Sequence, residues 1–93
     1  MTPKSLHLII SGHVQGVFFR AESQKKAQVL GLKGWVQNLP TGQVELYAQG
    51  DEKTLKQLLD WCKKGPPQAS VEDIQATWDK DFPVGSQFEV KHR

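Results

Sequence analysis

Two glycines and one arginine stand at a spacing that suits anion binding, in the segment Gly12-His13-Val14-Gln15-Gly16-Val17-Phe18-Phe19-Arg20. An alternating apolar run, residues 6–10, precedes this segment, and a helix-compatible run, residues 21–30, follows it. The segment is therefore predicted to form a tight loop between a strand and a helix. Such a loop can direct several backbone N–H groups at one anion, with a helix dipole and a guanidinium behind them. The spacing indicates a binding site for a phosphate-sized dianion.

Arg20 is predicted at the start of that helix, where its planar guanidinium could hold two oxygens of one phosphate. The loop lacks the Gly-Lys-Ser/Thr sequence of a Walker A motif, so a nucleoside triphosphate site is not indicated. Taken alone, two glycines and an arginine more often form an ordinary strand–helix turn with a surface arginine. The functional interpretation therefore needs a second group.

Asn38 ends the second predicted strand and is the candidate for that second group. In a split βαβ unit the first and second strands run parallel, with one strand between them. Asn38 and the glycine loop are therefore expected near the same end of the sheet. A neutral amide can hold a water molecule in a fixed orientation without taking its proton. The alternative is an asparagine that only caps the turn Pro40-Thr41-Gly42.

The spacing of apolar residues predicts seven elements that would position these side chains. The predicted strands are residues 5–12, 33–39, 44–49, 71–78 and 88–92, and the predicted helices are residues 20–30 and 51–64. The order βαββαβ plus a short final strand is typical of the ferredoxin-like α+β fold, a split-βαβ sandwich. We expect a mixed, mostly antiparallel sheet with both helices on one face and a solvated opposite face. This architecture hosts many functions and decides none of them.

Composition excludes several classes of protein. A length of 93 residues favours a single domain, residues 1–93, and a net charge of +2 is too small to indicate nucleic acid or a membrane surface as partner. No apolar stretch is long enough to span a bilayer, and the first residues lack the pattern of a signal peptide. One cysteine, Cys62, excludes an internal disulfide and fits the reducing cytoplasm. The sequence contains neither a Cys-x-x-Cys motif nor clustered histidines, so it does not indicate a metal site.

Two long motifs resemble signatures of one enzyme family. Gly12 to Arg20 resembles the acylphosphatase signature Gly-x-Val-Gln-Gly-Val-x-Phe-Arg. The stretch Gly34-Trp35-Val36-Gln37-Asn38, followed by Gly42-Gln43-Val44 and then Gly50, resembles the second signature of that family. The motifs stand in the order of the family and at about its spacing, and the similarity covers essentially the whole chain. The sequence is therefore similar to acylphosphatases throughout.

The resemblance implies hydrolysis of a small-molecule acyl phosphate to a carboxylate and inorganic phosphate, with no metal and no cofactor. Arg20 matches the phosphate-binding arginine of the family, and Asn38 matches its water-orienting asparagine. The loop that would cradle the phosphate comprises Gln15, Gly16, Val17, Phe18, Phe19 and Arg20. We expect a monomer in the cytoplasm that binds neither nucleic acid nor membrane. Ala21-Glu22-Ser23 departs from the usual start of this helix, which is expected to affect substrate preference or stability.

One alternative stays open on the residues alone: a ferredoxin-like module that binds nucleic acid or a phospholigand without catalysis. Lys33-Gly34-Trp35-Val36 faintly resembles the basic-glycine-aromatic strand of RNA-recognition domains, although a run of exposed aromatic residues on adjacent strands is missing. Among the histidines, His13 occupies an unspecified position of the first motif, and His7 and His92 are predicted to lie on strand surfaces. None of the three is predicted to be catalytic.

Overall fold

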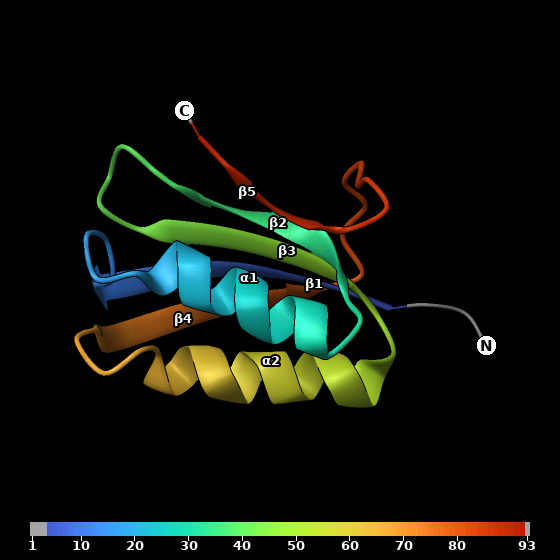
Figure 1. Cartoon of the computed structure of the whole chain (residues 1–93), viewed down its shortest axis with the longest axis horizontal. Coiled ribbons are helices and arrows are strands. Elements are labelled where there is room, and N and C mark those ends of the chain that lie inside the picture. Colours follow the sequence, from blue (N-terminus) through green and yellow to red (C-terminus); the bar gives the residue numbers. More distant parts are fainter. Residues whose placement is uncertain (1–3, 93) are drawn as a thin grey trace.

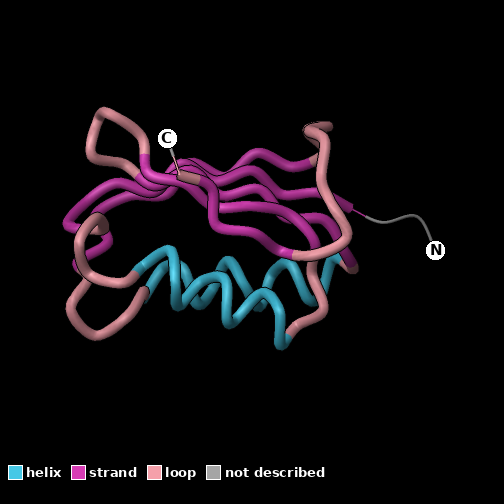
Figure 2. Tube along the Cα trace, turned by 45° about the horizontal axis from the view of Figure 1, so that its top comes forward, coloured by secondary structure: helices cyan, strands magenta, loops and turns pink. Residues whose placement is uncertain are grey.

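The computed structural model describes residues 4–92, which form a five-stranded sheet with two helices on one face (Figure 1). The strands are β1 (Lys4–His13), β2 (Lys33–Asn38), β3 (Val44–Gly50), β4 (Ser70–Trp78) and β5 (Phe88–Lys91), and the helices are α1 (Phe19–Val29) and α2 (Glu52–Lys64). Figure 2 shows the resulting two layers, with both helices below the strands. The predicted ferredoxin-like α+β fold is confirmed.

The strand order β4-β1-β3-β2-β5 determines which loops meet. Both β1 and β2 pair antiparallel with β3, so they run parallel to each other with β3 between them. β5 is added at the edge, parallel to β2. The carboxyl ends of β1, β2 and β5 therefore lie at one end of the sheet, together with the start of α1 (Figure 1).

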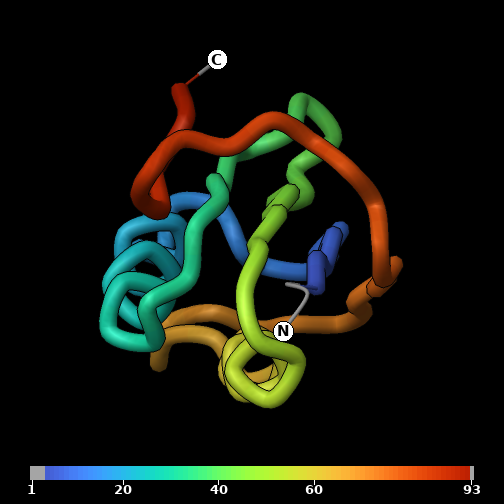
Figure 3. Tube along the Cα trace, turned by 90° about the vertical axis from the view of Figure 1, so that its right-hand side faces the viewer, coloured from blue at the N-terminus to red at the C-terminus, as the bar shows by residue number. Residues whose placement is uncertain are grey.

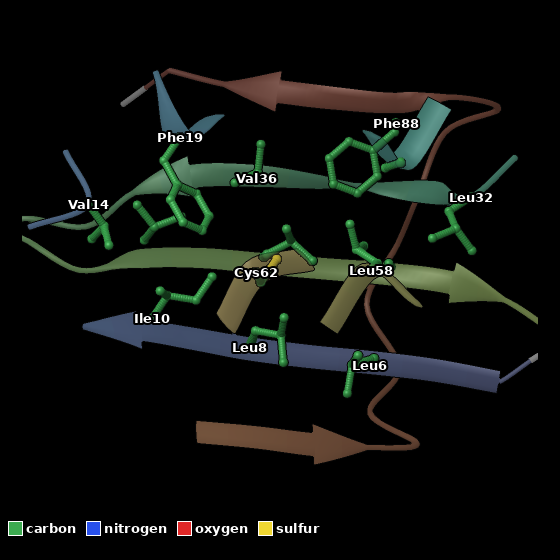
Figure 4. Close-up of a cluster of buried hydrophobic side chains, with 14 of the residues drawn as sticks. Leu6, Leu8, Ile10, Val14, Phe19, Leu32, Val36, Leu58, Cys62 and Phe88 are labelled. Carbon is green, nitrogen blue, oxygen red and sulfur yellow. The ribbon is translucent and has the colours of Figure 1, made fainter. Parts of the chain in front are cut away.

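The core lies between the helices and the sheet, as the apolar periodicity predicts. Alternate residues of β1, among them Leu8, pack against the buried stripe of α2, which includes Leu58 and Cys62 (Figure 4). Full burial of one such aliphatic side chain contributes roughly 1.5–3 kcal/mol. Burial also raises the pKa of the Cys62 thiol to about 12, so this cysteine is a packed side chain and not a nucleophile.

Helix α1 packs closely on the sheet because its inner face carries small residues. Ser23 and Ala27 are both fully buried there. Ser23 Oγ donates a hydrogen bond to the carbonyl oxygen of Arg20 at 3.0 Å, which satisfies the buried hydroxyl within the first turns of the helix. None of the described helices is long and apolar enough to cross a bilayer.

The opposite face of the sheet is solvated only in part. Gln75 and Thr77 of β4 are exposed on it, as predicted, but the area around Tyr47 is covered. Residues 79–87, the orange-to-red segment in Figure 3, arch across that face between β4 and β5. Phe82 packs on the rings of Tyr47, His7 and Trp35, with centroid separations of 5.0, 5.2 and 5.8 Å. The Tyr47 hydroxyl donates to the carbonyl oxygen of Lys80 at 2.9 Å. Strand alternation shows which side chains share a face, but not whether a distant loop covers it.

His7 is correspondingly not the surface residue that its strand position predicts. It is 8% exposed, stacks on Phe82, and its Nε2 lies 2.8 Å from Glu45 Oε2. Glu45 Oε1 in turn accepts a hydrogen bond from Gln37 Nε2 at 2.7 Å. The histidine therefore belongs to a polar network on the covered face, away from the loop that follows β1.

Candidate active site

The loop between β1 and α1 has an unusual backbone. Gly16 and Phe18 both adopt left-handed conformations, with φ angles of +75° and +66°. Phe18 occupies the N-cap position of α1, but its side chain cannot cap the helix and is 69% exposed. Left-handed residues within such a loop turn successive N–H groups toward one concavity, which is a recurrent anion-binding geometry. A bulky residue in this conformation is an outlier of the kind found at functional sites.

The N–H groups of this loop are available to a ligand. Within residues 4–92, the backbone N–H groups from Gln15 to Ala21 donate no hydrogen bond to a protein acceptor. The first bond donated after the loop runs from Glu22 N–H to the carbonyl oxygen of Phe18, at 3.0 Å. The free groups include the first turn of α1, where the helix dipole also favours a negative charge. The loop therefore offers a row of donors with partial positive charge.

Arg20 adds a full positive charge to the same end of α1. Its side chain is half-buried, and it forms no ion pair with a carboxylate among residues 4–92. The nearest polar partner of the guanidinium is His92, whose Nδ1 lies 3.4 Å from Arg20 Nη1. The guanidinium is therefore not neutralised within the described part of the chain.

Asn38 presents a buried acceptor with no donor. Its Oδ1 is inaccessible to solvent and has no hydrogen-bond partner in residues 4–92. A buried acceptor left in this state costs roughly 1–3 kcal/mol, so such atoms are rare unless a water molecule or ligand satisfies them. The alternative interpretation of Asn38 as a turn cap is not supported, because among residues 4–92 no N–H or O–H group donates a hydrogen bond to this oxygen.

One pocket of about 480 Å³ brings these groups together. The predicted site residues that line this pocket are Gly16, Phe18, Phe19, Arg20 and Asn38. Another hollow, of about 420 Å³, lies at the far end of α1 near Gln28, Gly31 and Lys33, and it gathers no comparable set of donors and charges. The pocket at the loop is therefore the candidate active site.

Gln15 and Val17, also in the predicted cradle, do not line this pocket. Gln15 Nε2 donates to the carbonyl oxygens of Leu39 and Gln43, at 2.8 and 2.9 Å. Its side chain therefore ties the loop to the β2–β3 turn, directly after Asn38. Val17 is 5% exposed and packs in the hydrophobic core. Only the backbone N–H groups of these two residues remain for a ligand.

His92 and Val90 line the pocket although the sequence did not single them out. Val90 pairs with Val36 across the parallel β2–β5 ladder. Asn38 and His92 each lie two residues beyond that pair in the chain, and both line the pocket. The alternation of Phe88, Val90 and His92 places all three on one face. Phe88 belongs to the core cluster that includes Leu55 and Leu58 of α2, which shows that this is the face toward the helices. Their place in the pocket could not be predicted, because the sequence does not show which strand pairs with β5.

Two polar residues near the start of α1 lie outside the pocket. Glu22 borders a separate hollow with Lys25, Lys26 and Trp61. His13, at the end of β1, is exposed and is not among the residues that line the candidate site. Within residues 4–92, no group of three or more His, Cys, Asp and Glu side chains is arranged to hold a metal ion.

The fold and the pocket together define a ferredoxin-like domain with a candidate phosphate site at one end of its sheet. Comparison with known proteins identifies the family more closely. A family model described as acylphosphatase matches residues 6–90. An acylphosphatase of Marinobacter nauticus is 46% identical over 88 residues, which cover 95% of this chain and 92% of that protein. The chain therefore belongs to the acylphosphatase family.

Solved structures agree with this assignment. The crystal structure of acylphosphatase from Bacillus subtilis is 34% identical, with a TM-score of 0.89 over 95% of this chain and 98% of that one. An acylphosphatase structure from Coxiella burnetii is 42% identical, with a TM-score of 0.86 over 96% of this chain and 93% of that one. The resemblance of the two motifs is confirmed, and so is the prediction that the chain is an enzyme of the acylphosphatase type.

Proposed function

We propose that this enzyme hydrolyses small-molecule acyl phosphates to a carboxylate and inorganic phosphate at the loop pocket, without a metal or cofactor. Arg20 and the backbone N–H groups of Gln15 to Arg20 bind the phosphate, and Asn38 orients the attacking water. One observation carries the proposal: a single pocket is lined by loop residues with unpaired N–H groups, by an unneutralised guanidinium and by Asn38, whose buried amide oxygen has no partner among residues 4–92. Each of these groups lacks the partner that a phosphate and a water molecule would supply.

Such a site suffices for this reaction because the leaving group is good. A carboxylate is the conjugate base of an acid with a pKa of about 4, so it departs without help from a general acid. Phosphoryl transfer passes through a loose transition state, in which catalysis consists mostly of positioning and charge stabilisation. The loop N–H groups and the Arg20 guanidinium supply that stabilisation at the three equatorial oxygens.

The nucleophile is a water molecule held by Asn38. The Oδ1 atom accepts one hydrogen bond from the water, which directs a lone pair of the water oxygen at phosphorus. The new P–O bond forms as the bond to the acyl oxygen breaks, and both electrons of the broken bond leave with the carboxylate. The proton of the water passes to a phosphoryl oxygen of the substrate. No side-chain base is needed, so we expect a kcat that is flat between mild acid and neutrality.

The alternative function as a nucleic-acid-binding module finds no support. RNA-recognition domains of this topology stack bases on exposed aromatic residues of the open sheet face. Here Trp35 and Tyr47 are 6% and 0% exposed, because Phe82 and its segment cover them. Stacking of bases on this face would require displacement of residues 79–87.

The same proposal takes residues 1–93 as one acylphosphatase-like domain and as a monomer in the cytoplasm that binds neither nucleic acid nor membrane. Large exposed apolar side chains are few among residues 4–92: Phe18, which lines the pocket, and Val29. A stable interface between copies of the chain needs a larger apolar patch than these two side chains provide. The single reduced cysteine fits the cytoplasm.

The test is phosphate release from a simple acyl phosphate in excess chelator, with wild-type protein and Arg20→Lys. The lysine keeps the charge but loses the two-pronged donor, so kcat/KM should fall on the order of 100-fold or more. Circular dichroism should show an unchanged fold. The matched control is Lys25→Arg, which replaces an exposed lysine of the same helix by arginine. This variant should leave the kinetics unchanged. Release at the spontaneous rate by the wild type, or normal kinetics of Arg20→Lys, would refute the proposal.

A further inference from the structure

His92 lines the candidate site, but the mechanism above gives it no role. It directly follows β5, two residues after Val90, and its imidazole lies beside the Arg20 guanidinium in the lining of the pocket. The separation between His92 Nδ1 and Arg20 Nη1 is 3.4 Å. An imidazole is one of the few side chains that can change its charge near neutral pH. Its place beside the candidate phosphate-binding arginine therefore has chemical consequences.

We propose that His92 is a second, titratable binding group for the phosphate dianion of the substrate. In the empty pocket the neutral imidazole accepts a hydrogen bond from Arg20, and with the dianion bound it takes up a proton and faces the phosphate as a cation. The inference rests on the proposed function, because it requires the phosphate to lie against Arg20 in this pocket.

The proposed neutral state of His92 before the dianion binds rests on the hydrogen-bond donors and acceptors that the two side chains offer. A guanidinium has five N–H donors and no acceptor, so a hydrogen bond from Arg20 Nη1 requires a bare lone pair on His92 Nδ1. A hydrogen bond between these two atoms therefore requires the neutral imidazole, with its proton on Nε2. Protonation of Nδ1 would place a second cation against the guanidinium without any anion between them. The empty pocket thus disfavours the imidazolium.

A bound dianion reverses this preference. Its two negative charges attract the imidazolium more strongly than the single positive charge of Arg20 repels it. Binding of the dianion is therefore coupled to proton uptake, and linkage requires the converse: lower pH strengthens dianion binding. Histidine side chains in general titrate near pH 6.5, so the effect belongs between about pH 5.5 and about pH 8.

Other charges of the elements packed around His92 face elsewhere. Among the charged residues of α1, only Arg20 lines the pocket, whereas the others border the hollow at Trp61: Glu22, Lys25 and Lys26. From β2, the pocket receives the uncharged Asn38, and Lys33 lies at the far end of the strand, in the hollow near Gln28.

The charged residues of β5 itself also point away from the pocket. Lys91 lies on the opposite face of the sheet, with its Nζ 4.8 Å from the centre of the Trp35 ring. Glu89 pairs with Trp35 in the β2–β5 ladder and therefore belongs to that same opposite face. Among the described residues that line the pocket, His92 is thus the one histidine, and no aspartate or glutamate lies with it.

Sulfate is a suitable probe because it keeps its two charges throughout this pH range, so a pH effect reports on the protein. We expect the dissociation constant of sulfate, measured by calorimetry, to fall about threefold or more from pH 8 to about pH 5.5. His92→Gln keeps an acceptor for Arg20 but cannot titrate, so its affinity should stay at the weak, high-pH value. His92→Lys carries a permanent charge and should show the tight value at both pH values.

Enzyme kinetics separate this role from a purely structural one. The apparent inhibition constant of sulfate should follow the calorimetric values, while kcat for the acyl phosphate stays flat in wild type and His92→Gln. His13→Gln, which removes an exposed histidine outside the pocket, should retain the full pH dependence. Wild-type affinity that does not vary with pH, or equal variation in His92→Gln, overturns the proposal. The proposed function fails differently, by absence of hydrolysis or by unchanged kinetics in Arg20→Lys.

Discussion

The amide oxygen of Asn38 destabilises the folded protein, and the proposed catalytic role explains why the residue is there. Its Oδ1 is buried and has no donor among the described residues. Replacement of such a group by an apolar one is nearly neutral or stabilising for the fold, because the unpaired acceptor disappears. The same replacement removes the group that would hold the nucleophilic water. Stability and activity should therefore respond in opposite directions at this position.

Asn38→Ala should reduce kcat by roughly 100-fold while the inhibition constant of phosphate changes only modestly. The thermal midpoint should stay the same or rise. Steady-state kinetics with phosphate as inhibitor and a melting curve measure both effects. Normal turnover combined with much weaker phosphate binding would instead assign Asn38 to the phosphate. A large fall in melting temperature would show that its oxygen has a structural partner.

A site residue can be predicted from the sequence when its position depends on residues that are close to it in the chain. Gly16 and Arg20 lie in one contiguous strand–loop–helix segment, and Asn38 follows from the strand order of the fold. His92 could not be predicted in this way, because its position depends on the pairing of β5 with β2, about fifty residues earlier in the chain. The side-chain role of Gln15 was hidden for a related reason, since its acceptors are carbonyl oxygens of another turn.

At the scale of elements, Gln15 connects the candidate phosphate loop, residues 15–20, to the β2–β3 turn. Its two hydrogen bonds end on carbonyl oxygens that also accept backbone bonds: Leu39 from Gly42 N–H, and Gln43 from Leu39 N–H. Loss of the Gln15 side chain therefore leaves neither oxygen without a partner. The connection serves chiefly to hold the loop and the strand that ends in Asn38 at a fixed separation.

Gln15→Ala should lower kcat/KM about tenfold, because the loop and Asn38 lose their fixed separation. The cost in the free energy of unfolding should be only about 1 kcal/mol, since both carbonyls remain bonded. Gln57→Ala, an exposed glutamine of α2, is the matched control and should change neither quantity appreciably. Denaturant titration and steady-state kinetics check both values. Unchanged kinetics in Gln15→Ala would show that the loop holds its shape alone.

For the molecule as a whole, residues 79–87 cover part of the face of the sheet that the helices leave open. Phe82 makes the central contacts, with His7, Trp35 and Tyr47, and its own exposure is intermediate. The sequence predicted both helices and all five strands because their periodicity is local. It could not predict this cover, since the aromatic residues beneath it come from three strands that are distant in sequence.

Phe82→Ala should destabilise the protein by about 2 kcal/mol, somewhat less than a fully buried phenylalanine would. The kcat should be unchanged, because the pocket opens on the other side of the sheet. Val29→Ala removes an exposed apolar side chain and should alter the free energy of unfolding little. Chemical denaturation measures the difference between the two variants. A large loss of activity in folded Phe82→Ala would mean that the cover also shapes the active site.

Alkylation of the buried Cys62 thiol can measure how often the protein opens. With a pKa of about 12 and no exposed surface, the native thiol should resist alkylation, whereas an unfolded chain presents an ordinary reactive thiolate. The labelling rate of the wild type with an alkylating reagent near pH 8 should therefore follow the population in which α2 has left the core. Rapid labelling under native conditions would contradict this expectation. Because Cys62 is the single cysteine, the same measurement would give the opening free energy of every variant above without an introduced probe.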